Sequence, residues 1–204
     1  MDNKLAQEAI SKDDVQGIGI GVPGPVDSQG VVHRCVNLGW GVVNVAEELG
    51  NLTGLKIKVG NDANVAALGE MWQGGAKGSK DVIMVTLGTG VGGGIIVDGK
   101  VVAGFNGAGG EIGHITVNND EIEACNCGQY GCLEQYTSAT GIVRLAKRKL
   151  AKSTEETSIR EIPNLTAKDV FDAAKAGDAI AIGLVDEVCE ILGSTLSNIA
   201  CVVN

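Results

Sequence analysis

Glycine limits what this chain can fold into, because it accounts for 31 of the 204 residues and is concentrated in dense clusters. The clusters are GIGIGVPGP, TLGTGVGGG and GFNGAGGEIGH, and apolar segments lie between them. Glycine allows the backbone to turn at positive φ and to approach a ligand closely. The clusters therefore predict several tight turns gathered at a ligand site, and not a flexible linker.

The rest of the composition is typical of a globular protein. Hydrophobic residues make up 44% of the chain, which is long enough to bury the core of one large domain or two small ones. No apolar run could span a bilayer, and the opening MDNKLAQEAISKDD lacks the apolar region of a signal peptide. We therefore expect a reducing, cytoplasmic setting, where clustered cysteines bind metal more often than they form disulfides.

The charge argues against a nucleic-acid partner. The formal net charge is −9, whereas phosphate backbones attract clustered lysine and arginine. Only RLAKRKLAK, from Arg144 to Lys152, is locally basic, and we interpret it as the solvated face of a helix.

Apolar periodicity predicts a mixed α/β chain. Strands are expected within residues 15–27 and in LKIKVGND, and helices over residues 44–54 and in ANVAALGEMWQG. Residues 81–104 predict three strands joined by a glycine turn and an Asp-Gly turn. From Ser138 the pattern is helical, with a polar loop over residues 153–164, and the final CVVN predicts the start of another strand.

These elements fall into two blocks on either side of Lys80, which predicts two lobes with a cleft between them. Residues 1–79 would form part of a small lobe, and residues 80–204 would form part of a large lobe. One continuous α/β domain is the alternative, because no internal repeat is strong enough to demonstrate duplication.

Three of the six cysteines and one of the two histidines lie within 19 residues. Cys125, Cys127 and Cys132 have the spacing C-x-C-x4-C, and His114 precedes them by eleven residues. Three thiolates and an imidazole complete a closed tetrahedral zinc site, which leaves no position for a reactive water and is therefore structural. Incidental thiols beside a core histidine are the alternative.

Two carboxylates bracket this cluster. Glu111 and Glu134 are not needed by a metal that four ligands already satisfy. A polyhydroxylated ligand would offer hydrogen-bond donors that match such acceptors. Solvated glutamates are the alternative for either residue alone.

Two further motifs suggest chemistry. VGNDANVAALGE places Asn61 and Asp62 between a strand and a helix, where α/β proteins gather ligands. Asp62 could cap that helix or accept a proton from a substrate hydroxyl. TLGTGVGGG could be a plain hairpin, or a phosphate cradle of backbone N–H groups and the hydroxyls of Thr86 or Thr89. It is not a P-loop, because no Gly-Lys-Ser/Thr follows.

Together these motifs resemble the ROK family of sugar kinases and repressors. GIGIGVPGPVD, NDANVAALGE, TLGTGVGGGIIVDGK, GAGGEIGH and CNCGQYGCLEQYTS stand in the order found in that family, from about Val15 to the end. The motifs are most similar to those of its bacterial glucokinases. The histidine with C-x-C-G-x2-G-C-L-E is highly specific, whereas the glycine turns are not.

The resemblance implies an actin-like, hexokinase-like (ribonuclease H-like) α/β fold of two lobes with the sugar in the interlobe cleft. It implies an ATP-dependent, Mg²⁺-assisted kinase of carbohydrate metabolism that phosphorylates glucose, the first step of glycolysis. Its implied site residues comprise a catalytic base, sugar-binding groups, a phosphate turn and the ligands of a structural zinc ion. These are Asp62 as the base; Asn61, Glu111, His114 and Glu134 for the sugar; Gly88, Thr89, Gly90 and Gly92 for phosphate; and His114, Cys125, Cys127 and Cys132 for zinc.

The sequence also departs from the family pattern. Family kinases begin with a strand and turn bearing D-x-G-G-T, and nothing before Val15 resembles it. They continue past VVN into a glycine cluster that seats adenosine, whereas this sequence stops at Asn204. Both differences fall on the nucleotide side. We therefore expect a fold that is incomplete at both ends and a chain that phosphorylates poorly.

Two alternatives remain within the family. An N-acetylhexosamine or fructose kinase would differ in the shape of the sugar pocket. A repressor binds a sugar with the same lobes and reads DNA through an added N-terminal helix-turn-helix. A repressor does not need the aspartate of NDAN, so Asp62 favours a kinase. The resemblance also implies a dimer or tetramer.

Overall fold

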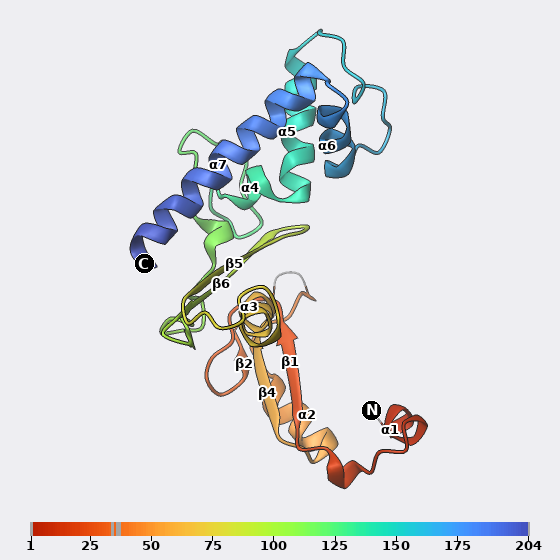
Figure 1. Cartoon of the computed structure of the whole chain (residues 1–204), viewed down its shortest axis with the longest axis vertical. Coiled ribbons are helices and arrows are strands. Elements are labelled where there is room, and N and C mark those ends of the chain that lie inside the picture. The colour runs from red at the N-terminus through yellow and green to blue at the C-terminus, as the bar shows by residue number, and fades with distance from the viewer. Residues whose placement is uncertain (1, 34, 36–37, 204) are drawn as a thin grey trace.

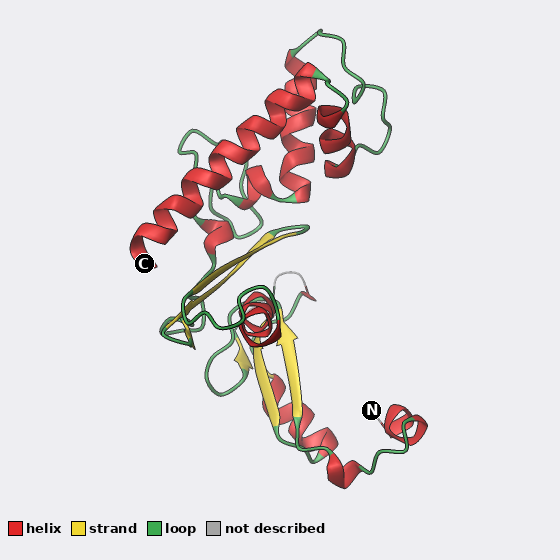
Figure 2. Ribbon diagram, in the orientation of Figure 1, coloured by secondary structure: helices red, strands yellow, loops and turns green. Residues whose placement is uncertain are grey.

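The computed structural model describes residues 2–33, 35 and 38–203, which form a mixed α/β structure (Figures 1 and 2). Two small sheets and one three-stranded sheet are combined with α-helices of 4 to 25 residues and with short 3-10 helices, which are labelled η. The elements in chain order are α1 Asp2–Gln7, η1 Lys12–Asp14, β1 Ile18–Val22, β2 Val31–Val32, β3 Val43–Asn44, α2 Val45–Thr53, β4 Ile57–Asn61, α3 Asp62–Gln73, β5 Val82–Leu87, β6 Val91–Val97, β7 Lys100–Val101, η3 Ile112–His114, α4 Glu134–Thr137, α5 Ala139–Lys152, α6 Ala167–Lys175 and α7 Ala179–Val203.

The first block of the chain is built on a parallel strand pair. β1 pairs with β4 in a register that places Ile18 beside Ile57 and Val22 beside Asn61. α2 connects β3 to β4, and it ends at Gly54, whose left-handed φ of 70° closes the helix. This register brings the end of β1 and the end of β4 to the same edge, where the next segments of both strands turn into the site.

α3 joins the two blocks. It contacts β1 and β4 on one side and the antiparallel sheet β5–β6–β7 on the other (Figure 1). Glycines in β6 permit this close packing, because a Cβ atom on Gly94 would lie 2.6 Å from the Cβ of Ala67 in α3. Residues before and after Lys80 therefore share an interface, and the division into lobes at residues 1–79 and 80–204 stays a prediction.

The C-terminal part is a helical layer. α4, α5, α6 and α7 enclose an apolar core that includes Leu145, Val170 and Leu184. The expected polar loop over residues 153–164 contains no helix or strand, but it contributes Ile159, which is 1% exposed, to the same core. In the described part of the chain, no helix combines the length and apolarity needed to cross a membrane.

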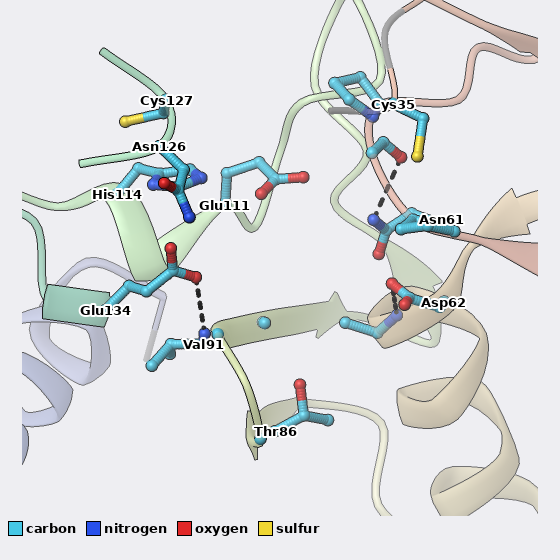
Figure 3. A pocket seen from close by; sticks show the side chains of 18 of the residues that line it. Cys35, Asn61, Asp62, Thr86, Val91, Glu111, His114, Asn126, Cys127 and Glu134 are labelled. Atoms are coloured by element: carbon cyan, nitrogen blue, oxygen red, sulfur yellow. Dashed lines mark hydrogen bonds between the residues drawn. The ribbon is translucent and has the colours of Figure 1, made fainter. Parts of the chain in front are cut away.

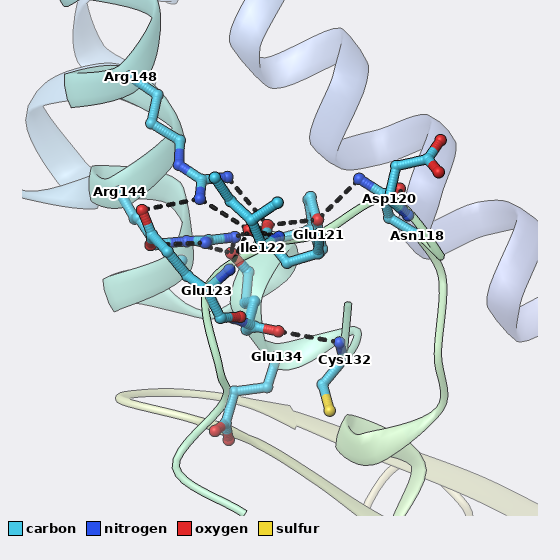
Figure 4. Close-up of polar contacts among 12 residues, drawn as sticks. Asn118, Asp120, Glu121, Ile122, Glu123, Cys132, Glu134, Arg144 and Arg148 are labelled. Carbon is cyan, nitrogen blue, oxygen red and sulfur yellow. Dashed lines mark hydrogen bonds and ion pairs between the residues drawn. The ribbon is translucent and has the colours of Figure 1, made fainter. Parts of the chain in front are cut away.

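Two expectations about this part were wrong. The residues Cys201–Val203 continue α7 and do not begin a strand, and Asn204 lies outside the described residues. The helix persists because Leu192, Leu196, Ile199 and Val203 recur at helical spacing against the sheet core around β6. The basic stretch in α5 is not simply a solvated face, because Arg144 and Arg148 both pair with the buried carboxylate of Glu121 (Figure 4).

Candidate active site

A cleft of about 530 Å³ opens between the end of β4, the β5–β6 turn and the cysteine-rich segment (Figure 3). This size lies within the range of small-molecule sites. All three glycine clusters noted in the sequence reach it or the turns beside it. Its lining is Pro23, Gly24, Pro25, Cys35, Asn61, Asp62, Ala63, Thr86, Leu87, Gly88, Gly90, Val91, Gly92, Gly93, Glu111, His114, Asn126, Cys127 and Glu134.

The residue that caps helix α3 is Asn61 and not Asp62. The N-cap of α3 is Asn61, whose side-chain oxygen accepts from the backbone N–H of Asn64 at 3.1 Å. The Asn61 amide also donates to the carbonyl of Gly24 at 3.2 Å, which ties the loop after β1 to the start of α3. Within the described residues, the carboxylate of Asp62 accepts a hydrogen bond only from the adjacent N–H of Ala63, at 2.9 Å, and Asp62 is exposed and lines the cleft. Helix capping therefore does not explain this aspartate.

Glu111 and Glu134 occupy the cleft wall that carries the metal-type cluster. Burial raises the pKa of the Glu111 carboxyl; the charge of His114 opposes this, and the carboxylates of Asp62 and Glu134 add to it. Glu134 is held firmly, because its Oε2 accepts from the backbone N–H of Val91 at 3.0 Å. Three carboxylates around one cleft suit a neutral ligand rich in hydroxyl donors better than an anion.

The cysteine cluster assembles as the spacing predicted. One candidate ligand atom from each of His114, Cys125, Cys127 and Cys132 lies within 4.8 Å of the others. The Sγ atoms of Cys127 and Cys132 are 3.7 Å apart, and His114 Nδ1 lies 3.9 Å from Cys125 Sγ. Tetrahedral zinc with Zn–S bonds of about 2.3 Å requires sulfur atoms about 3.8 Å apart. The donor set and its spacing therefore fit a closed zinc site.

The surroundings of two of the thiols disfavour the charged thiolate form. Burial and the neighbouring thiols raise the pKa of both Cys125 and Cys132. A divalent cation would reverse this, because coordination stabilises the thiolate form. His114 belongs to this cluster and also lines the cleft, so one side chain joins the metal site to the ligand site.

The backbone around the cluster folds back on itself at a position that requires glycine. Thr116 bridges to Cys132, and Ala124 bridges to Tyr130, so that the chain doubles back twice. Gly131 adopts a φ of 71°, and a Cβ atom there would collide with the carbonyl oxygen of Asn118. Only glycine meets both requirements at this crossing.

Some of the residues predicted to bind phosphate, in the glycine turn between β5 and β6, line the cleft. Gly88, Gly90 and Gly92 line the cleft, whereas Thr89 does not. The turn is anchored to the start of α5, because the Thr140 hydroxyl donates to the Thr89 carbonyl at 2.8 Å and the Ala139 N–H donates to the Gly88 carbonyl at 2.9 Å.

Several lining residues had no functional assignment from sequence. Pro23, Gly24 and Pro25 form the loop after β1, and Cys35 and Asn126 come from two other loops. The Gly-Pro turn was visible in the sequence, but only the register of β1 against β4 places it beside Asn61. Cys35 and Asn126 have no local sequence signal, because their positions at the cleft depend on tertiary contacts.

The comparisons with known proteins identify the family of this chain. A model of the ROK family matches residues 3–204. A glucokinase of Halalkalibacterium halodurans is 44% identical over 208 residues, which cover all of this chain and 63% of that protein. A ROK glucokinase from Streptomyces griseus, solved with glucose and AMPPNP, is 34% identical with a TM-score of 0.79, over 99% of this chain and 67% of the other. A ROK transcriptional regulator superposes with a TM-score of 0.85 at 27% identity, over 97% of this chain and 50% of the other.

The chain therefore belongs to the ROK family. The expected fold class is confirmed, because this mixed α/β structure superposes on solved ROK kinases along nearly its whole length. The chain spans 63% of the length of the glucokinase from H. halodurans.

Proposed function

We propose that this chain forms the sugar-binding part of a glucokinase, which transfers the γ-phosphate of ATP to glucose. The observation that supports the proposal is the carboxylate of Asp62, which is exposed and does not serve as the N-cap of α3. It shares a cleft with Glu111, His114 and Glu134. A base beside a set of hydroxyl acceptors is what phosphorylation of a sugar hydroxyl requires. The names of the similar glucokinases support the same substrates.

In this mechanism Asp62 accepts the proton of the glucose 6-hydroxyl as the hydroxyl oxygen attacks the γ-phosphorus, and the bond from the γ-phosphorus to the bridging oxygen breaks so that ADP leaves. Glu111 and Glu134 accept hydrogen bonds from other hydroxyls, and His114 and the Asn61 amide complete the sugar contacts. Positioning of this kind and electrostatic stabilisation are the main contributions a protein makes to phosphoryl transfer, and a carboxylate that accepts the hydroxyl proton orients the nucleophile. Loss of the base costs about 10²- to 10⁴-fold in rate.

The glycine turn supplies the phosphate side. The backbone N–H groups of the turn from Gly88 to Gly92 would face the phosphates of ATP, and Thr89 would contribute through its backbone at most, because it does not line the cleft. Mg²⁺ would enter with ATP and neutralise its charge. The hydrogen bonds from α5 hold the turn in place before ATP binds.

Zn²⁺ would be held by His114, Cys125, Cys127 and Cys132 and would stabilise the local fold, without a role in the transfer step. The closed donor set leaves no position for substrate or water. Its effect on the reaction is to orient the imidazole of His114, since coordination through one ring nitrogen directs the other.

The test compares the parent protein with Asp62→Asn, in the longest open reading frame that contains this chain. We expect Asp62→Asn to lower ATP-dependent glucose phosphorylation at least about 100-fold. Glucose affinity, measured by isothermal titration, should remain within about threefold, because the amide keeps the shape of the carboxylate. The matched control is Asp172→Asn, which removes an exposed carboxylate on α6. Retention of turnover in Asp62→Asn would refute the assignment of the base.

A sugar-sensing repressor is the second candidate, because the ROK transcriptional regulator superposes so well. In a sensor Asp62→Asn would leave the response to sugar intact while no phosphate transfer is detected in the parent. Titration with glucose, N-acetylglucosamine and fructose identifies the sugar in either case. A cytoplasmic location and assembly into a dimer or tetramer stay predictions.

A further inference from the structure

A buried carboxylate lies outside the active-site cleft, on the loop that joins His114 to Cys125. The Glu121 side chain is 1% exposed. It accepts from the Tyr136 hydroxyl at 2.7 Å, from Arg144 Nη2 at 2.9 Å and from both terminal nitrogens of Arg148 at 2.9 and 2.7 Å (Figure 4). A buried charge is stable only when it is paired and hydrogen-bonded in this way. We call Glu121, Glu123, Tyr136, Arg144 and Arg148 the acid clamp.

The acid clamp joins two segments that are distant in the sequence. Its arginines lie one turn apart on α5, and its two acids lie on the loop between the metal-type ligands. Glu123 pairs with Arg144 at 3.0 Å and with Arg148 at 2.8 Å. Arg144 also lies over the Tyr136 ring, 5.3 Å from its centroid.

A chain of hydrogen bonds leads from the acid clamp to a thiol ligand. Arg144 donates to the Gln135 carbonyl at 3.0 and 3.3 Å. The Gln135 side chain donates to the Glu123 carbonyl at 2.9 Å, and its oxygen accepts from the Cys132 N–H at 3.1 Å. Gln135 is buried and adjoins Glu134, so the acid clamp holds a cysteine ligand and a cleft residue at once.

The loop contributes little apolar burial of its own. Ile122 is 85% exposed, and Asp120, Glu121 and Glu123 place three acids within four consecutive residues. Without compensation these charges would repel one another. The two arginines of α5 supply that compensation.

We propose that Glu121 and the arginines of α5 preorganise the metal site, by holding the loop from His114 to Cys125 in its ligand-presenting conformation before the metal binds. Glu121 is thus a positioning residue for the cluster of His114, Cys125, Cys127 and Cys132. The proposal rests on the metal site included in the proposed function, but not on the kinase reaction.

The test uses this chain, stripped of metal and titrated with Co²⁺, whose tetrahedral thiolate complexes absorb visible light. The parent should bind Co²⁺ with the absorption of a three-sulfur, one-nitrogen site. Glu121→Gln should bind about 10- to 100-fold more weakly, as is typical when groups that orient metal ligands are lost. Hydrogen exchange of residues 118–124 in the metal-free protein should be faster in the variant than in the parent.

A control and a second variant make the result specific to the acid clamp. Asp172→Asn removes a carboxylate that pairs with Lys168 on exposed α6, and its Co²⁺ affinity and spectrum should match those of the parent. If Glu121→Gln does not fold, Tyr136→Phe replaces it, since it keeps the ring against Arg144 and removes the hydrogen bond to the Glu121 carboxylate together with the one that Asn118 donates to the hydroxyl. Its Co²⁺ affinity should fall at least about tenfold, as expected when a hydrogen bond to a charged group is lost.

The proposal is overturned if a folded Glu121→Gln or Tyr136→Phe protein binds Co²⁺ with the affinity of the parent. It is also overturned if the parent gives no thiolate–cobalt absorption, because the metal site itself would then be absent. Neither outcome involves a sugar or ATP, so failure of the proposed kinase reaction is detected separately, by the phosphorylation assay.

Discussion

Comparing alanine substitutions at Gly131 and at Gly128 tests one backbone contact in the cysteine-rich segment, the approach of Gly131 to Asn118. Both glycines have left-handed φ values, 71° for Gly131 and 92° for Gly128. A Cβ atom on Gly128 would meet nothing within 4 Å, whereas one on Gly131 would collide with the Asn118 carbonyl oxygen and lie 3.4 Å from the Asn118 Cα. Both substitutions therefore place alanine at positive φ, and Gly131→Ala adds a steric contact that Gly128→Ala lacks.

The expected costs follow from these two terms. A left-handed conformation costs alanine about 1–2 kcal/mol. Alanine also lowers the conformational entropy of the unfolded chain, which stabilises the folded state by about 0.4–1 kcal/mol. Gly128→Ala should therefore destabilise the chain by about 1 kcal/mol. Gly131→Ala adds about 1–3 kcal/mol for overpacking, because Asn118 cannot retreat without stretching the 2.7 Å bond from Val117 N–H to the Gly131 carbonyl.

The assay is urea unfolding of both variants and the parent, with metal present and after chelation. We expect Gly131→Ala to lose about 2–4 kcal/mol of unfolding free energy, which is roughly 4–16 °C in Tm for a chain of this size. Gly128→Ala should lose a few degrees. Equal losses in the two variants would refute the reasoning, because they would show that the contact with Asn118 does not constrain the fold.

Three further predictions concern the elements around the site. Thr140→Val removes the hydroxyl bonded to the Thr89 carbonyl; it should cost about 1 kcal/mol and speed amide exchange in the glycine turn, measured by mass spectrometry. Gly94→Ala should destabilise by about 1–3 kcal/mol in thermal unfolding, because the new methyl group would overlap Ala67. Burial would raise the pKa of Asp178, but hydrogen bonds from two backbone N–H groups and two hydroxyls lower it to about 2. Because the folded pKa lies below the unfolded value of about 3.9, this carboxylate stabilises the fold above pH 4, and the stabilisation is lost as the pH falls toward 2. Asp178→Ala should therefore lower stability at pH 7 by about 1 kcal/mol, and the difference should shrink in urea unfolding as the pH is lowered from 4 toward 2.

Local features of this protein were predictable because neighbouring residues determine them. His114, Cys125, Cys127 and Cys132 lie so near one another in the chain that a few turns bring them together, and the structure confirms their clustering. The end of α2 at Gly54 and the junction of β4 with α3 also agree with expectation, since caps and apolar periodicity act over only a few residues.

The capping of α3 was decided by local geometry that the motif alone left open. NDAN offers two side chains that could cap the helix, and the structure uses Asn61. The choice leaves Asp62 exposed in the cleft, which makes it available for chemistry.

Other features follow only from tertiary packing. The basic stretch of α5 has the same local pattern whether its arginines face water or Glu121, 27 residues before Arg148. Cys201–Val203 could extend a strand or a helix until the sheet core against Ile199 is in place. The amino-acid sequence thus determined the clustering of His114 with three cysteines, the glycine turns and the end of α2, which depend on short-range geometry. The tertiary structure decided which charges are buried and which segments meet at the cleft, because those outcomes depend on contacts between residues far apart in the sequence.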